Sequence, residues 1–286
     1  MADFYSRRRD HFRDKPECVV DFPPWLLSVQ KMDEYRQLPR LAIAEMAGRD
    51  SVAAAIVAVQ TNGFTDLLPV YAYTGTEYGP WAGVETAVDR LRHRLPQTRV
   101  HDLLVLGSPH FWHALNGRFI NELIRRYGFY TPCVGCHLYL HAVRFPLALN
   151  LKAPVIAGER ETHDGAVKVN QSATALNCYQ DLANHFDVPL LFPLRHMDDG
   201  KEIESILGFD WKQDEDQLRC VLSGNYRNLD NRVKITEKMV QGCLREFAFP
   251  LALQTLEAYR QNRIPDHRKL ALDIFQSLKA GKVLPQ

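Results

Sequence analysis

Three cysteines have a spacing that suits a metal centre. Cys133 and Cys136 form a CxxC pair, and Cys220 lies far downstream in the chain. Two thiolates separated by two residues can bind one metal ion or one cluster, and a third thiolate from a distant loop completes a tripod. Three cysteines on a [4Fe–4S] cluster leave one iron open for an external ligand. The pattern therefore indicates a cluster site at these residues.

The same segment allows other interpretations. The string CVGCH has the CxxCH spacing of haem attachment, but that chemistry requires export, and we expect no secretory signal at the basic N-terminus. Zinc could bind two cysteines and two histidines spaced i, i+4 on one helix face, Cys133, Cys136, His137 and His141. A redox dithiol and a chance pair remain open. The other cysteines are expected to be structural: Cys18, Cys178 and Cys243.

A second segment suits phosphate binding. Small and polar residues at positions 45–51 follow an apolar run and precede an Ala-rich stretch. A glycine such as Gly48 lets the backbone approach a ligand, and the start of a helix offers unpaired N–H groups to an anion. Asp50 or Ser51 could equally serve as a helix N-cap.

Short apolar runs alternate with helical patterns along the middle of the chain. Strands are expected at 41–46, 67–73, 101–108, 153–159 and 188–194. Helices are expected at 51–60, 82–95, 111–128, 137–152, 170–186, 200–208, 233–260 and 267–281, with Pro146 kinking or restarting the fourth. This alternation predicts βαβ units and an α/β fold with a parallel five-stranded sheet and flanking helices. Ligands of such sheets lie beyond the carboxyl ends of the strands.

Three regions follow from these patterns. Residues 1–38 are expected to be an N-terminal arm, residues 39–228 the α/β domain that carries the cysteines, and residues 229–286 a helical C-terminal extension.

Composition excludes several classes of protein. The chain of 286 residues has 46% hydrophobic and 24% charged residues, which excludes wholesale disorder. Its 35 basic and 34 acidic residues give a formal net charge of +1, so no overall charge favours nucleic acid. No apolar run reaches the length of a membrane span. We expect a cytoplasmic protein that does not associate with membranes.

Residues 48–51, Gly-Arg-Asp-Ser, resemble the PP-loop of the ATP pyrophosphatase superfamily, whose pattern is SGGxDS at the end of the first strand. The second Gly, the Asp and the Ser of that pattern are matched, whereas Met46 and Ala47 stand where it has Ser and Gly. The strand end at 73–77 and the stretch beginning VIAGE are similar to further family segments, in the order of tRNA 4-thiouridine synthetases. The resemblance spans residues 40–208, and the cysteine layout resembles that of the 2-thiocytidine synthetases.

This resemblance implies an adenine nucleotide alpha hydrolase-like, Rossmann-like fold with ATP, Mg²⁺ and a [4Fe–4S] cluster as cofactors. Gly48 would allow backbone approach, Asp50 would organise metal or phosphate, and Ser51 would bond a phosphate. Further nucleotide contacts are expected at Ala47, Arg49, Thr74, Gly75, Gly158, Lys168 and Gln171. Asp50, Cys133, Cys136 and Cys220 would be the catalytic set, with the cysteines as cluster ligands.

The implied activity is ATP-dependent sulfur transfer, in which adenylation of a nucleobase-type carbonyl lets sulfur replace oxygen. The acceptor could be a free base, another small heterocycle or a tRNA base, and sulfur could come from a cysteine desulfurase or free sulfide. A homodimer would agree with the resemblance. Two alternatives stay open, a zinc-containing PP-loop ligase that forms an amide or nitrile, and a non-catalytic nucleotide- or cluster-binding protein.

Overall fold

The computed structural model describes residues 18–20, 27–212 and 215–281. Its main sheet has seven parallel strands in the order β1-β6-β3-β2-β7-β8, with β5 paired to β3. These strands are β1 Cys18–Val20, β2 Leu41–Glu45, β3 Asp66–Ala72, β5 Arg99–Val100, β6 Leu104–Gly107, β7 Val155–Ile156 and β8 Leu190–Leu191. A separate antiparallel pair joins β4 (Glu77–Tyr78) to β9 (Arg219–Cys220).

The predicted parallel α/β fold is confirmed, but the count of five strands is wrong. Every residue of β2 and β3 is buried, as expected for strands covered on both faces by helices. The five predicted runs correspond to β2, β3, β6, β7 and β8. The two additional strands, β1 and β5, have three and two residues and lack an apolar run long enough to predict a strand.

The helices are α2 Val29–Arg36, α3 Arg49–Asn62, α4 Ala82–Arg94, α5 Pro109–Asn116, α6 Ile120–Tyr127, α7 Pro132–Ala142, α8 Phe145–Leu151, α9 Ala173–His185, α10 Gly200–Leu207, α11 Glu237–Cys243, α12 Phe249–Arg260 and α13 His267–Lys279. Single turns occur at Val169–Gln171 and Leu244–Ala248. The helix expected at 111–128 is divided at Gly117 into α5 and α6. The helix expected at 137–152 restarts as α8, with Pro146 in its first turn, where proline loses no hydrogen bond.

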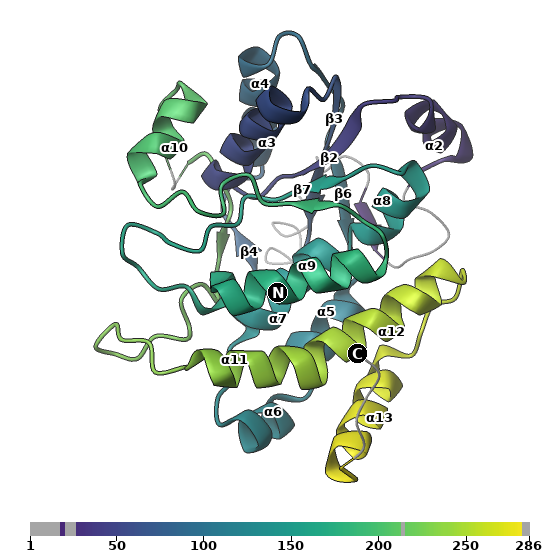
Figure 1. Cartoon of the computed structure of the whole chain (residues 1–286), viewed down its shortest axis with the longest axis vertical. Coiled ribbons are helices and arrows are strands. Elements are labelled where there is room, and N and C mark those ends of the chain that lie inside the picture. The colour runs from purple at the N-terminus through teal and green to yellow at the C-terminus, as the bar shows by residue number, and fades with distance from the viewer. Residues whose placement is uncertain (1–17, 21–26, 213–214, 282–286) are drawn as a thin grey trace, which may run out of the picture.

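Two apolar clusters cover the two faces of the sheet. One cluster joins α3, α4 and α10 to the sheet, and the other joins α5, α7, α8, α9, α12 and α13 to it. In Figure 1, α3 and α4 lie at the top of the view, and α9, α11 and α12 lie below the sheet. The Ala-rich side of α3 allows its backbone to pack closely on β2. This packing fixes the start of α3 at the carboxyl end of β2.

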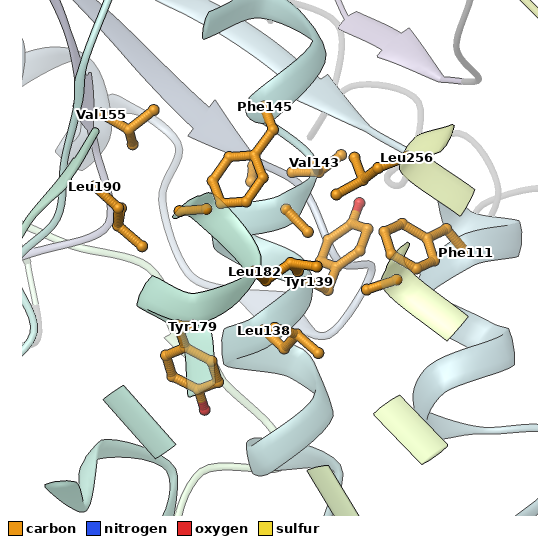
Figure 2. Packing of buried hydrophobic residues seen from close by; sticks show 14 of the residues in the cluster. Phe111, Leu138, Tyr139, Val143, Phe145, Val155, Tyr179, Leu182, Leu190 and Leu256 are labelled. Carbon is orange, nitrogen blue, oxygen red and sulfur yellow. The ribbon is translucent and has the colours of Figure 1, made fainter. Parts of the chain in front are cut away.

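The C-terminal helices share the core of the sheet domain. Phe111, Tyr139 and Leu256, from α5, α7 and α12, belong to one buried cluster, which Figure 2 shows from close by. The rings of Phe111 and Tyr139 meet edge to face with centroids 5.6 Å apart. Helix α7, which carries the CxxC pair, is therefore packed between the sheet and the C-terminal helices.

Most of the predicted N-terminal arm lies outside the described residues, and the part of it that is described contains β1 and α2. Among the described residues, none of the helices has both the length and the apolar character needed to span a bilayer.

Candidate functional site

The loop between β2 and α3 is held closed by one hydroxyl group. The backbone N–H groups of Ala47 and Gly48 each donate to Ser51 Oγ at 3.0 Å, and this hydroxyl donates to the Gly48 carbonyl at 2.7 Å. Gly48 is the N-cap of α3 with extended backbone. The predicted phosphate ligand Ser51 thus has its hydroxyl engaged with the loop itself.

Cationic side chains surround the start of α3. The carboxylate of Asp50 pairs with Arg49 Nε and Arg160 Nε, each at 3.0 Å. The guanidinium of Arg160 is 2% exposed and also donates to the carbonyls of Met197 and Asp198. Arg49 also lies 3.7 Å from Glu204, so its charge is shared between two carboxylates. The unpaired N–H groups and the dipole of the helix N-terminus, with the two guanidinium groups beside it, suit an anion.

Gly158 lies directly against this helix start. A Cβ atom at Gly158 would lie 2.5 Å from the backbone nitrogen of Ser51 and 2.6 Å from the carbonyl carbon of Asp50. Because both neighbours are backbone atoms, they cannot rotate away. The absence of a side chain at this position therefore lets the segment after β7 contact the first turn of α3.

The β2–α3 loop borders a cavity of about 450 Å³ that also contains the three cysteines. Seven of the residues predicted for the site line it: Ala47, Thr74, Cys133, Cys136, Lys168, Gln171 and Cys220. The helix start formed by residues 48–51 lies next to it, and Gly158 contacts that start. Gly75 is in the exposed turn after Thr74.

All three cysteine thiols form hydrogen bonds beside this cavity, and those of Cys136 and Cys220 accept them from N–H groups. Trp112 Nε1 donates to Cys136 Sγ at 3.2 Å, and the backbone N–H of Leu222 donates to Cys220 Sγ at 3.4 Å. Burial raises the pKa of the Cys133 thiol, and the nearby Cys220 raises it further. Burial likewise raises the pKa of Cys136, which the Trp112 hydrogen bond opposes. The three thiols are close enough to influence one another electrostatically.

A short strand pair positions Cys220. Residue 220 of β9 lies opposite Glu77 of β4, and Thr76 Oγ1 is 3.1 Å from Cys220 Sγ. The Glu77 carboxylate accepts hydrogen bonds from the backbone N–H groups of Thr74 and Gly75 at 2.7 and 2.8 Å. The turn that follows β3 thus holds the third cysteine near the CxxC pair.

The two histidines considered as zinc ligands, His137 and His141, each pair with a glutamate. His137 Nδ1 is 2.8 Å from Glu159 Oε1, and His141 Nδ1 is 2.8 Å from Glu45 Oε1. Within the described residues, no three His, Cys, Asp or Glu side chains come together closely enough to hold a metal ion. A zinc ion needs its ligands about 2.0–2.3 Å away, whereas a cluster spans more space and accepts cysteines that lie farther apart.

These histidines belong to a buried ionic network that sequence patterns did not reveal. Arg144 and His141, each 1% exposed at the side chain, both contact Glu45 Oε1. His141 Nε2 also lies 3.2 Å from Glu159 Oε1. Burial alone would lower the pKa of His141, but the charge of Glu45 and hydrogen bonds to both glutamates raise it to about 9. A glutamate ending the apolar run LAIAE was the one available signal.

Lys168 and Gln171 lie on the side of the cavity near this network. Burial lowers the pKa of the Lys168 ammonium, and Gln171 Nε2 donates to the Glu159 carboxylate. Burial alone would raise the pKa of Glu159, but the charges of His137 and His141 hold it well below its usual range. Glu159 is therefore an anion inside the protein.

No protein-family model matches the sequence. Two solved structures are distant in both fold and sequence. A 4-thiouridine synthetase in complex with RNA and bound ATP has a TM-score of 0.44 and 16% identity, over 83% of this chain and 53% of that chain. The U34-tRNA thiolase NcsA from Methanococcus maripaludis, with its [4Fe–4S] cluster, has a TM-score of 0.41 and 13% identity, over 90% of this chain and 81% of that chain.

One protein shares much higher sequence identity with this chain than the two solved structures do. The uncharacterized protein MJ0009 of Methanocaldococcus jannaschii is 40% identical over 231 residues, which cover 79% of this chain and 83% of that protein. At this identity and coverage, the chain belongs to the same protein family as MJ0009.

Proposed function

We propose that this chain is a PP-loop ATP-dependent sulfurtransferase that adenylates a nucleobase-type carbonyl and replaces its oxygen by sulfur. One observation carries the proposal: Cys133, Cys136 and Cys220 line the same cavity as Met46 and Ala47, the first two residues of the β2–α3 loop. An activating nucleotide at the loop and a sulfur centre at the cysteines would then act on one acceptor between them.

The loop fits a nucleotide triphosphate. Helix α3 has 14 residues, so its N-terminus presents a full helix dipole to an anion. Arg49, Arg160 and Lys168 supply positive charge near it, and Gly158 allows the end of β7 to approach. Mg²⁺ would enter with ATP to offset the triphosphate charge, and Asp50 is the carboxylate of the loop that could help to organise it.

The cysteines fit a cluster better than a single ion. They supply three thiolate ligands around one cavity, and N–H donors from Trp112 and Leu222 point at two of their sulfurs. Hydrogen bonds to cluster sulfurs are a common means of tuning such a centre. When bound to three cysteines, a [4Fe–4S] cluster would supply one open iron that can hold the sulfide to be transferred.

The side chains of the cavity would then have separate roles. The start of α3 and Lys168 would bind and orient the phosphates, while Trp112 and Leu140 would exclude water from the activated acceptor. The acceptor oxygen attacks the α-phosphorus and pyrophosphate leaves. Sulfide then forms a bond to the acceptor carbon, and the C–O bond breaks to release AMP.

A thiolation assay tests this proposal. The full chain would be incubated without oxygen with ATP, Mg²⁺ and sulfide, and with uracil, cytosine or bulk tRNA as acceptor. We expect AMP, pyrophosphate and a thiolated product in equal amounts from wild type. Cys220→Ala should abolish the product, whereas Cys243→Ala, at a cysteine outside the cavity, should retain it.

Other outcomes would contradict the proposal in identifiable ways. An ammonia-dependent amide or nitrile product, with zinc in place of iron, would indicate the ligase. If no acceptor led to release of pyrophosphate from ATP, the chain would be a non-catalytic nucleotide- or cluster-binding protein.

A further inference from the structure

The side chain of Gln217 lies on the start of α3, where a phosphate would bind. The backbone N–H of Arg49 donates to Gln217 Oε1 at 3.2 Å. A Cβ atom at Gly48 would lie 2.4 Å from the same oxygen, so the amide rests directly on the glycine. Trp211 Nε1 donates to Gln217 Oε1 at 3.1 Å and holds it there. The Gln217 amide oxygen therefore occupies the Arg49 N–H, which is one of the donors that an anion at the start of α3 would need.

The backbone beside Gln217 is fixed to the opposite side of the loop. A Cβ atom at Gly83, in the first turn of α4, would lie 2.7 Å from the carbonyl oxygen of Glu215 and 3.2 Å from the nitrogen of Gln217. The Asp216 carboxylate pairs with Arg90 at 2.8 Å. The chain is therefore anchored just before Gln217, so a backbone shift at this residue would pass to the residues that follow it.

Cys220 is three residues farther along the chain. It lies in β9, which contains only two residues and pairs with the two-residue strand β4. So short a pair holds its register weakly compared with a strand inside a sheet. A shift at Gln217 would thus reach Cys220 Sγ, which contacts Thr76 Oγ1 at 3.1 Å.

We propose that Gln217 is a positioning residue that competes with nucleotide phosphate for the start of α3 and thereby couples nucleotide binding to the position of Cys220. The inference rests on the nucleotide site of the proposed function, but it needs neither the cluster nor sulfur transfer. Phosphate displaces the Gln217 amide from Arg49 N–H, and the freed segment moves Cys220 relative to Cys133 and Cys136.

Binding measurements on the full chain test the competition. ATP with Mg²⁺ would be titrated by calorimetry into wild type, Gln217→Ala and Gln217→Glu. Loss of one neutral competing hydrogen bond should tighten ATP binding roughly 2- to 10-fold in the alanine variant. The glutamate variant keeps an acceptor and adds negative charge, so it should weaken binding. Gln276→Ala, at an exposed glutamine of α13, should bind like wild type.

Alkylation of Cys220 tests the coupling. The reduced, chelator-treated full chain would be treated with iodoacetamide, with and without ATP, and the rate at Cys220 measured by peptide mass spectrometry. ATP should change this rate at least 3-fold in wild type. In Gln217→Ala the rate should already be altered and should respond little to ATP.

Each result decides between the proposals. ATP binding that is equal in wild type and Gln217→Ala, or a Cys220 rate that ignores ATP in wild type, would overturn this inference alone. If ATP bound to none of the variants, the nucleotide site of the proposed function would fail together with it. ATP binding and coupling without any thiolated product would leave the inference intact and overturn sulfur transfer.

Discussion

At Gly158 the segment after β7 meets the start of α3 with no room for a side chain, because a Cβ atom would lie 2.5 Å from the nitrogen of Ser51. Gly158→Ala must therefore push the loop away from its position. We expect a loss of about 1–3 kcal/mol in the free energy of unfolding. ATP affinity should fall at least 10-fold as the helix start moves, measured by urea unfolding and by calorimetric titration.

Gly242→Ala is the matched control for this prediction. A Cβ atom at Gly242, within α11, would have Tyr127 at 3.5 Å as its nearest contact, an ordinary packing distance. Alanine is a better helix former than glycine, so this variant should be unchanged or slightly more stable. Equal ATP affinity in Gly158→Ala and Gly242→Ala would show that the contact at β7 does not shape a nucleotide site.

The buried network around His141 predicts a pH dependence of stability. Burial alone would lower the pKa of His141, but Glu45 in β2 and Glu159 in the segment after β7 face it and raise its folded pKa to about 9. A raised pKa stabilises the fold fully below the unfolded value near 6.5, and this stabilisation is lost as pH rises through 9. The loss should be on the order of 3 kcal/mol.

Urea unfolding at pH 6, 7, 8 and 9 measures this loss. His141→Gln should be less stable than wild type at pH 6, and its stability should change much less toward pH 9. Parallel pH profiles for the two proteins would contradict a charged His141 in the folded state. Glu159 should affect the free energy of unfolding at acidic pH. Its depressed pKa stabilises the fold above the unfolded value near 4.5, and this stabilisation is lost as pH falls through the folded pKa.

Single residues differ in how well the sequence predicted them. The three cysteines were predicted to act together, and the structure places them around one cavity, since thiol spacing is a chemical signal in itself. Glu45 and Arg144 were not expected to form a buried pair, because each looks like an ordinary charged residue until the fold brings β2 and the start of α8 together. Gln217 gave no signal, since its contact with residue 49 joins distant parts of the chain.

At the scale of elements, helix α7 determines where the CxxC pair lies. Its N-cap Thr131 accepts a hydrogen bond from the Cys133 backbone N–H at 3.2 Å and donates to Asn225 Oδ1 at 2.6 Å. Thr131→Ala should lower the free energy of unfolding by about 1–2 kcal/mol. It should also lower the iron retained per chain, because the first turn of α7 carries Cys133. Chemical unfolding and iron analysis measure the two effects.

Thr236→Ala removes an equivalent cap from α11, where Thr236 Oγ1 accepts from the Met239 backbone N–H. It should cost similar stability but leave the iron content unchanged, because α11 does not line the cavity. Iron loss of the same size in both variants would mean that general destabilisation, and not the position of Cys133, controls the metal centre.

Elements that lie within a long apolar run were predictable, including the two-residue strands β7 and β8, whereas short elements outside such runs were not. Strands β2 and β3 are apolar except for one acidic residue at an end of each, and Pro146 correctly indicated that the helix restarts at α8. The pairing of β4 with β9 involves two residues on each strand, which is too few for any pattern. This pairing brings Cys220 to the cavity, so the sequence indicated Cys220 as a candidate third ligand but not the strand pair that positions it.

Across the whole molecule, the two apolar clusters place the β2–α3 loop and the three cysteines on one edge of the sheet. The cluster around α3 fixes the β2–α3 loop, and the cluster around α7 and α12 fixes the CxxC helix. The two meet where parallel strands end, which is the general ligand site of such sheets. The central claim is therefore that the three cysteines form one cluster site at this edge.

Metal analysis of anaerobically purified chain tests this claim most directly. Iron, acid-labile sulfide and zinc would be measured with the visible spectrum for wild type, Cys133→Ala, Cys136→Ala and Cys220→Ala, with Cys243→Ala as control. We predict about four irons per wild-type and control chain, and loss of iron and of the visible band in all three cavity variants. Stoichiometric zinc without iron, or iron retained after loss of Cys220, would contradict the account.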